Sequence, residues 1–251
     1  KFAEPRIELI NFRNHGVIAA SRNEGIRRAR GEYVAFLDSD DVWKPTKLEC
    51  CIEQLNAGCA LVCHGTIWRW EDGRTRNVTH GPERKASYQV LLYRDNCLAT
   101  SATVVRKMIL NEVGGFSTEP DFVTAEDYDL WLRIAKAGHQ FCFIPGMLGE
   151  YRIHQANEGR YGRVKDAVLA VLDHHFVLDS RRHVFRQYKQ RKRRSGVISA
   201  NAWILGNTGD YQSAVHEFRL ALKTWPLNWK AYAAGTLMVA RWAISRLPKR
   251  S

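Results

Sequence analysis

Three carboxylates crowd into four consecutive positions, at Asp38, Asp40 and Asp41. Their mutual repulsion is costly unless a cation or hydrogen-bond donors compensate it. In extended backbone, the first and third side chains of an Asp-x-Asp sequence point to the same face, so Asp38 and Asp40 can converge on one ion. Carboxylate oxygens favour Mg²⁺ or Mn²⁺, and phosphate oxygens often complete the shell. The spacing alone fits a solvated acidic turn that caps the next helix as well as it fits a metal site.

A second acidic pair, Glu126 and Asp127, stands at the start of a predicted helix that Gly138 closes. The helix dipole favours carboxylates in this position, so a purely stabilising role is one interpretation. An apolar stripe would hold the helix rigidly against the core: Leu130, Trp131, Ile134 and Ala137. A rigid mount of this kind suits a general base, for which Asp127 is the candidate.

His154 is a third candidate, at the end of the strand-like segment Tyr151–Ile153. Its imidazole can ligate a metal ion or, when protonated, donate to a phosphate. An ordinary surface or packing role is the alternative for an isolated histidine.

Short β-type runs alternate with amphipathic helical stretches in the first half of the chain, which is typical of an α/β fold with a largely parallel sheet. We expect strands at residues 7–12, 32–37, 60–70 and 98–105. We expect helices at residues 17–30, 45–56 and 125–137, with Pro45 in the first turn of the second. The strand at 32–37 delivers Asp38 at its carboxyl end, where open α/β sheets bind ligands.

Beyond His154 the pattern becomes entirely helical, most clearly at residues 164–176 and 197–205. Residues 202–228 resemble one tetratricopeptide-type unit. Because stacked repeats normally need several units, we interpret this part as a helical hairpin that covers the first domain. A peptide-binding repeat array is the alternative.

Composition places the 251 residues among globular proteins, since 45% are hydrophobic and 8 are Trp. No run approaches the roughly 18 apolar residues of a membrane span, and the first residues carry no apolar signal core. The cysteines form no Cys-x-x-Cys pair and lie mostly within apolar runs, which indicates buried thiols in a reducing compartment. They are Cys50, Cys51, Cys59, Cys63, Cys97 and Cys142.

The net charge of +12 is unevenly distributed along the chain. Residues 1–159 hold 20 Lys and Arg against 21 Asp and Glu, whereas residues 160–251 hold 18 against 5. The basic run at residues 181–194 would suit an anionic surface such as a membrane. A nucleic-acid-binding protein is the rival class, but no recognised binding motif accompanies the charge, so we expect no nucleic acid partner.

Taken together and in order, these segments resemble family 2 of the inverting glycosyltransferases, whose catalytic domain has the GT-A fold. Asn14–Ile26 is similar to the family's Asn-x-Gly-x-x-x-Ala-Arg-Asn-x-Gly-Ile segment, with Ser21 where alanine is usual. Gly31–Trp43 is close to the family's metal-binding strand and turn. The other matching segments are Thr100–Ala102, Gly114–Phe116, Ala125–Arg133 and Tyr151–His154. We therefore divide the chain into a GT-A-like catalytic domain at 1–157 and a basic helical extension at 158–251.

The resemblance implies a metal-dependent enzyme that moves a sugar from a UDP-, GDP- or dTDP-sugar to a saccharide or lipid-linked acceptor. Its setting would be bacterial surface polysaccharide synthesis, in the cytoplasm or peripherally at the inner face of the cell membrane. The basic extension fits that setting, although a solvated helical face explains it equally well.

Site roles carried over from the family fall on matching positions of this sequence. Asp40 would coordinate Mg²⁺ or Mn²⁺, and Asp38 would contact the ribose or a metal-bound water. His154 is a further candidate metal ligand. Candidate contacts to the donor are Arg22 and Asp41.

The predicted chemistry is a single displacement that inverts the anomeric configuration. Asp127 would take the proton from the acceptor hydroxyl as that oxygen attacks the anomeric carbon. Glu126 would shape the acceptor site.

Family members normally begin further upstream, with two strands and a helix that hold the nucleotide base, whereas Phe2–Ile7 resembles the run just before the third strand. We therefore expect an N-terminally truncated catalytic domain that binds a nucleotide weakly or not at all. The alternative function is a catalytically inert fragment that acts as an interaction module through its basic helical region.

Overall fold

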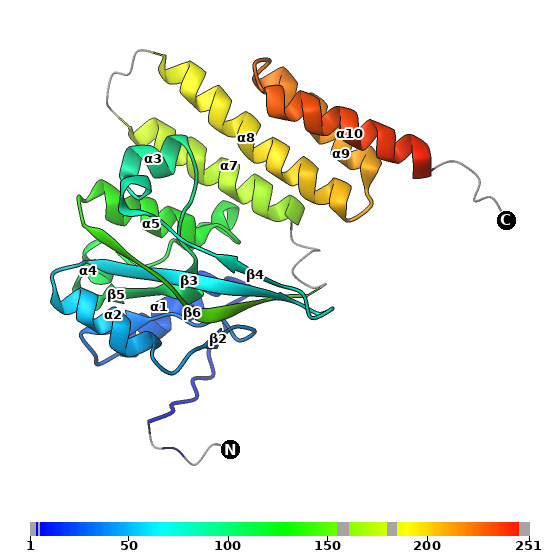
Figure 1. The fold of residues 1–251 in the computed structure, drawn as a ribbon. Coiled ribbons are helices and arrows are strands. Elements are labelled where there is room, and N and C mark those ends of the chain that lie inside the picture. Colours follow the sequence, from blue (N-terminus) through cyan, green and yellow to red (C-terminus); the bar gives the residue numbers. More distant parts are fainter. Residues whose placement is uncertain (1–3, 5, 155–160, 180–184, 246–251) are drawn as a thin grey trace.

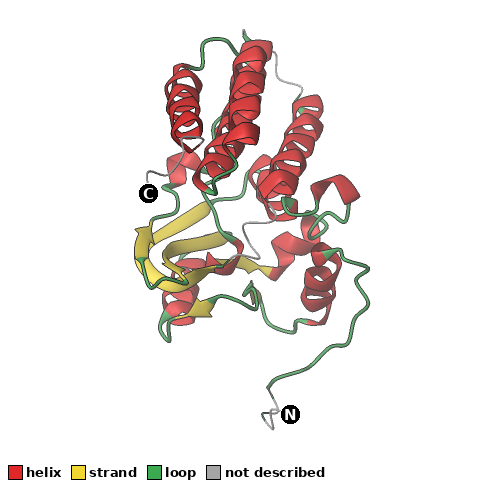
Figure 2. Ribbon diagram, turned by 90° about the vertical axis from the view of Figure 1, so that its right-hand side faces the viewer, coloured by secondary structure: helices red, strands yellow, loops and turns green. Residues whose placement is uncertain are grey.

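The computed structural model describes residues 4, 6–154, 161–179 and 185–245 (Figure 1). A twisted sheet and its flanking helices form the first part of the chain. Long helices form the second part and stand together on one side of the sheet, as Figure 2 also shows. None of the described helices is long and apolar enough to cross a membrane.

The described part of the chain contains six strands and several helices. The strands are β1 (Tyr33–Ala35), β2 (Val42–Trp43), β3 (Leu61–Trp70), β4 (Thr75–Val78), β5 (Thr103–Arg106) and β6 (Phe141–Ile153). The α-helices of the first part are α1 (Ile18–Arg28), α2 (Lys47–Asn56), α3 (Tyr88–Tyr93), α4 (Lys107–Glu112) and α5 (Glu126–Lys136). The later helices are α7 (Tyr161–Leu178), α8 (Arg186–Asn207), α9 (Tyr211–Thr224) and α10 (Trp229–Ser245). Three 3₁₀ turns are η1 (Glu83–Lys85), η2 (Thr100–Ala102) and η3 (Pro120–Phe122).

The sheet has the strand order β1-β5-β3-β6-β2, with β4 paired to β3. Our expectation of a largely parallel sheet is wrong, because β3 and β6 form the parallel pair and the other described pairs are antiparallel. A long connection that includes α3, α4 and α5 links β3 to β6, and it allows β6 to run parallel to β3. Strand β5 inserts between β1 and β3 and runs opposite to both.

Most predicted elements are confirmed within a few residues, but α8 begins well before the helix predicted at 197–205, and two strand predictions need correction. Residues 7–12 form no strand: Leu9 is 88% exposed, and no described strand lies beside this segment to pair with it. The strand expected at 98–105 is shorter, because η2 precedes β5. Pro45 lies just before α2 rather than within its first turn.

Helix α5 forms the centre of the first core. Leu130, Trp131 and Ile134 are fully buried as predicted, whereas Ala137 is exposed at the end of the helix. The Arg133 guanidinium donates to the backbone oxygens of Val113 (2.5 Å) and Gly115 (2.7 Å), which ties α5 to the loop after α4. Helix α5 is therefore held rigidly.

The long helices contribute to two separate cores. Val171, Leu172 and Phe176 of α7 belong to the same core as the sheet, so this helix covers the sheet. Beside them, His175 Nε2 of α7 lies 3.0 Å from Asp129 Oδ1 of α5, with both side chains buried. Helices α8, α9 and α10 share a second core that includes Phe218.

The cysteines depart from the predicted set of buried thiols, because Cys59 and Cys142 form a disulfide. Cys142 lies on β6 opposite Val62 of β3, and Cys59 immediately precedes β3, so the parallel pairing brings together residues 83 positions apart. The thiols of Cys51 and Cys63 are buried, which raises their pKa values to about 11 and about 12. These two groups are therefore unreactive.

Candidate functional site

The acidic turn follows β1, as predicted. The Asp41 backbone N–H donates to the Asp38 oxygen at 3.1 Å, which closes the turn. The Asp41 side chain points inward, where it accepts the backbone N–H of Arg152 on β6 at 3.2 Å. Burial raises the pKa of Asp41, and a hydrogen bond from Ser101 opposes that rise. This geometry ties Asp41 to β6, and its contact to the donor stays a prediction.

A group of residues behind the turn holds it in place. The Ser101 hydroxyl accepts the backbone N–H of Asp38 at 3.0 Å. The Ser101 backbone oxygen in turn accepts hydrogen bonds from Trp43 Nε1 at 2.9 Å and from Lys47 Nζ at 2.8 Å. Ser101 thus joins η2 to the acidic turn. No local sequence pattern indicates a role for Ser101 or Lys47, since only the folded chain brings them to the acidic turn.

Arg22 on α1 connects the two acidic clusters. Its Nη2 lies 2.7 Å from Asp38 Oδ1, and its Nη1 lies 2.6 Å from Glu126 Oε1. The guanidinium also stands 5.3 Å from the centroid of the Phe116 ring. Burial opposes the charge, but the two carboxylates outweigh it and raise the pKa of Arg22. Arg22 therefore joins the turn after β1 to the start of α5.

Glu126 and Asp127 occupy different environments at the start of α5. Glu126 is 5% exposed, and its second carboxylate oxygen accepts the backbone N–H of Thr124 at 2.8 Å. Asp127 is partly exposed, and its Oδ2 accepts the Thr100 hydroxyl at 2.8 Å. Burial raises the pKa of Asp127, and the charge of Glu126 adds to that effect. A carboxylate with a raised pKa is a better base than an ordinary aspartate.

Asp40 and His154 form the outer part of the site. His154 Nε2 lies 3.0 Å from Asp40 Oδ2, and both side chains are about a third exposed. Asp38 contacts Arg22, and no cluster of three or more His, Cys, Asp or Glu groups suited to a metal occurs among the described residues. The Asp40 carboxylate and the His154 imidazole still fit a divalent ion whose remaining ligands are phosphate oxygens.

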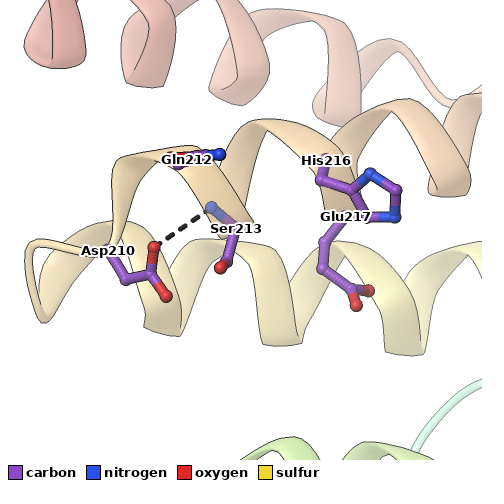
Figure 3. A pocket seen from close by; sticks show the side chains of 5 residues that line it. All are labelled: Asp210, Gln212, Ser213, His216 and Glu217. Atoms are coloured by element: carbon purple, nitrogen blue, oxygen red, sulfur yellow. Dashed lines mark hydrogen bonds between the residues drawn. The ribbon is translucent and has the colours of Figure 1, made fainter.

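A hollow of about 340 Å³ on α9 lies apart from these groups (Figure 3). It is lined by Asp210, Gln212, Ser213, His216 and Glu217. The Asp210 carboxylate caps α9 by accepting the Ser213 backbone N–H at 3.1 Å, and Glu217 pairs with Lys165 at 2.8 Å. These contacts cap α9 and join it to α7.

Comparisons with known proteins connect the chain to glycosyltransferases. Residues 1–114 match the sequence family described as "Glycosyl transferase family 2". The chain is 33% identical over 152 residues to the putative teichuronic acid biosynthesis glycosyltransferase TuaG of Bacillus subtilis, covering 60% of this chain and 58% of TuaG. It is 30% identical over 158 residues to the Escherichia coli UDP-Glc:alpha-D-GlcNAc-diphosphoundecaprenol beta-1,3-glucosyltransferase WfgD, covering 62% of this chain and 60% of WfgD. The chain thus spans less than two thirds of the length of these relatives.

Solved structures show the fold class. The mannosyltransferase PcManGT from Pyrobaculum calidifontis, solved in complex with GDP-Man and Mn²⁺, matches with a TM-score of 0.50 and 17% identity over 98% of this chain and 61% of that one. Staphylococcus aureus TarS 1-349 matches with a TM-score of 0.50 and 11% identity over 92% and 72%. These likenesses confirm the predicted GT-A fold.

Proposed function

We propose that this chain, whose residues 1–114 match glycosyl transferase family 2, is the catalytic region of an inverting, nucleotide-sugar-dependent glycosyltransferase. Its donor would be a UDP-, GDP- or dTDP-sugar, and its acceptor a saccharide or a lipid-linked saccharide in bacterial surface polysaccharide synthesis. The names of TuaG, a teichuronic acid enzyme, and WfgD, which acts on a diphosphoundecaprenol-linked sugar, support this acceptor class.

One observation carries the proposal: Arg22 holds Asp38 and Glu126 through contacts of 2.7 Å and 2.6 Å. A glycosyl transfer needs groups that bind the nucleotide sugar and a base that meets the acceptor, all within one site. The Arg22 guanidinium contacts both acidic segments and so holds them close together, as such a site would require. Because Arg22 is 16% exposed, its charge acts on them with little screening by water.

Asp127 is the proposed general base. The hydrogen bond from Thr100 orients its carboxylate, and its raised pKa prepares it to accept the proton of the acceptor hydroxyl. Glu126, fixed by Arg22 and by the backbone N–H of Thr124, shapes the wall beside that base.

Asp40 and His154, with Asp38 nearby, would hold a divalent ion such as Mg²⁺ or Mn²⁺, which supplies positive charge to the diphosphate leaving group when bound. The contact of 3.0 Å between His154 and Asp40 keeps these two groups together. Arg22 would add a fixed cation beside Asp38, so the donor's negative charge would meet positive charge from two directions.

The test is the substitution Asp127→Asn in the protein as its gene encodes it. Turnover of the nucleotide sugar should fall about a hundredfold or more, because the amide cannot accept the proton, while donor affinity stays nearly constant. Asp121→Asn, an exposed position on η3, is the matched control and should leave turnover unchanged. An equal loss of donor affinity in Asp127→Asn would contradict the assignment.

We also propose that the enzyme works in the cytoplasm, held at the inner face of the cell membrane by its basic extension. Lys189, Arg191 and Lys192 are exposed on α8 and available to anionic headgroups. Each basic residue near such a surface adds about 1 kcal/mol of attraction. Arg181 and Arg182 of the same basic run lie outside the described residues.

A further inference from the structure

A cavity of about 590 Å³ lies between the sheet domain and the long helices. Its walls come from the loop after α3, the start of α5, helices α7 and α8, and the start of α10. Figure 1 shows α7 and α8 passing above α3 and α5, which brings these segments together. The volume is within the range of small-molecule sites, about 300–1,000 Å³. Asp127 is among the lining residues, so the cavity adjoins the proposed base.

Two side chains from α8 line this cavity and carry buried, unpaired hydrogen-bonding atoms. Arg193 is 8% exposed and Asn201 is 5% exposed. Within the described part of the protein, Arg193 Nε and Asn201 Oδ1 have no hydrogen-bond partner. Buried polar atoms are almost always paired in native proteins, so unpaired ones at a cavity wall indicate a ligand that completes them.

The cavity offers donors, acceptors and positive charge on partly apolar walls. Arg193 Nη2 stands 3.3 Å from Asp95 Oδ1 and 3.5 Å from the Tyr128 hydroxyl, which fixes the guanidinium beside the start of α5. Arg94 and Lys230 add exposed cations to the lining. Hydroxyl-rich ligands need such mixed donors and acceptors, and a guanidinium with ammonium groups favours an anionic substituent.

We propose that this cavity binds the acceptor, a saccharide that carries an anionic group, and that α8 and α10 supply its recognition residues Arg193, Asn201 and Lys230. The inference rests on the proposed function, since Asp127 would meet the acceptor hydroxyl at the cavity wall. It gives the helical extension a direct part in substrate choice, beyond covering the first domain.

The test is equilibrium binding by calorimetry or ligand-observed NMR, with no donor present. The probes are glucose 1-phosphate, methyl glucuronide, neutral methyl glucoside and inorganic phosphate. Either glucose 1-phosphate or methyl glucuronide should bind about tenfold more tightly than methyl glucoside, because a charge-assisted hydrogen bond is stronger than a neutral one. The preferred charged sugar distinguishes a phosphate group from a uronate. Equal binding of the neutral sugar, or inorganic phosphate binding as well as glucose 1-phosphate, would overturn the proposal.

Two variants locate the binding. Asn201→Ala should weaken binding of the preferred probe about fivefold or more. Lys230 is exposed and folding does not need it, so Lys230→Ala should weaken probe binding by a similar factor without unfolding the protein. Lys223→Ala, exposed on α9 and outside the cavity, is the matched control and should bind like the parent protein. Unchanged affinity in Lys230→Ala and in folded Asn201→Ala would refute the assignment.

The outcome is independent of turnover, so the two proposals can fail separately. If Asp127→Asn keeps full activity while Lys230→Ala loses probe binding, the catalytic assignment is wrong and the cavity remains a saccharide site. If Asp127→Asn loses activity while both cavity variants bind normally, the acceptor binds elsewhere.

Discussion

Lys47 is fully buried behind the acidic turn, and this burial has a measurable consequence for stability. Its Nζ donates to the Ser101 backbone oxygen at 2.8 Å and lies 3.6 Å from the centroid of the Trp43 ring. Burial lowers the pKa of Lys47 from its ordinary 10.5 to about 7. The folded protein therefore holds a neutral amine above about pH 7, whereas the unfolded chain keeps an ammonium until about pH 10.5.

The sign of the effect follows from the protons that each state binds. Between these two pKa values the unfolded chain binds one proton more than the folded protein, so the free energy of unfolding rises with pH. The slope is about 1.4 kcal/mol per pH unit. From about pH 7 to about pH 9.5, the parent protein should therefore gain about 3 kcal/mol relative to Lys47→Met, in which this proton is absent.

Urea unfolding followed by tryptophan fluorescence measures this difference at a series of pH values. Subtracting the Lys47→Met curve removes the contribution of all other titrating groups that the two proteins share. Lys44→Met, an exposed lysine on the same turn, is the control for loss of a lysine charge. A difference between the parent and Lys47→Met that stays constant over this pH range would show that the buried lysine remains charged, and would refute the reasoning.

Two further predictions concern the charges of the molecule. Arg22→Gln should lower the free energy of unfolding by about 3–5 kcal/mol in urea denaturation, because Glu126 would remain buried without a cation. Arg27→Gln, which breaks a pair between the exposed Arg27 and Glu24, should lower the free energy of unfolding much less. Equal losses of stability in both variants would count against the stabilising role of Arg22 between Asp38 and Glu126. The protein should also sediment with anionic vesicles at low salt and be released at high salt. Replacing Lys189, Arg191 and Lys192 by Gln should weaken that binding, whereas retention on neutral vesicles at high salt would argue against an electrostatic attachment.

Local patterns in the sequence were sufficient to predict the elements that carry the site. The apolar spacing around Leu130 and Trp131 identified α5, and the apolar run before Asp38 identified β1, because such spacing depends on nearby residues alone. The order of the matching segments also identified the GT-A fold. Glu126 and Asp127 could be singled out for the same reason, since their position at a helix start is a local property.

Features that depend on distant residues were not predictable in this way. The Ser101 contacts to Asp38 and Lys47 join segments more than fifty residues apart, so no local spacing indicates them. Strand direction depends on which strands become neighbours, and the disulfide between Cys59 and Cys142 requires that same pairing. Residues 7–12 have a strand-like pattern, but a strand also needs a partner.

The packing of α7 has a consequence for how this protein can be divided into smaller pieces. Phe176 and its neighbours belong to the same core as the sheet, and His175 contacts Asp129 of α5. A polypeptide ending at the predicted boundary of 157 would leave an open apolar face and a buried carboxylate without its imidazole. The smallest piece that folds by itself should therefore extend through α7.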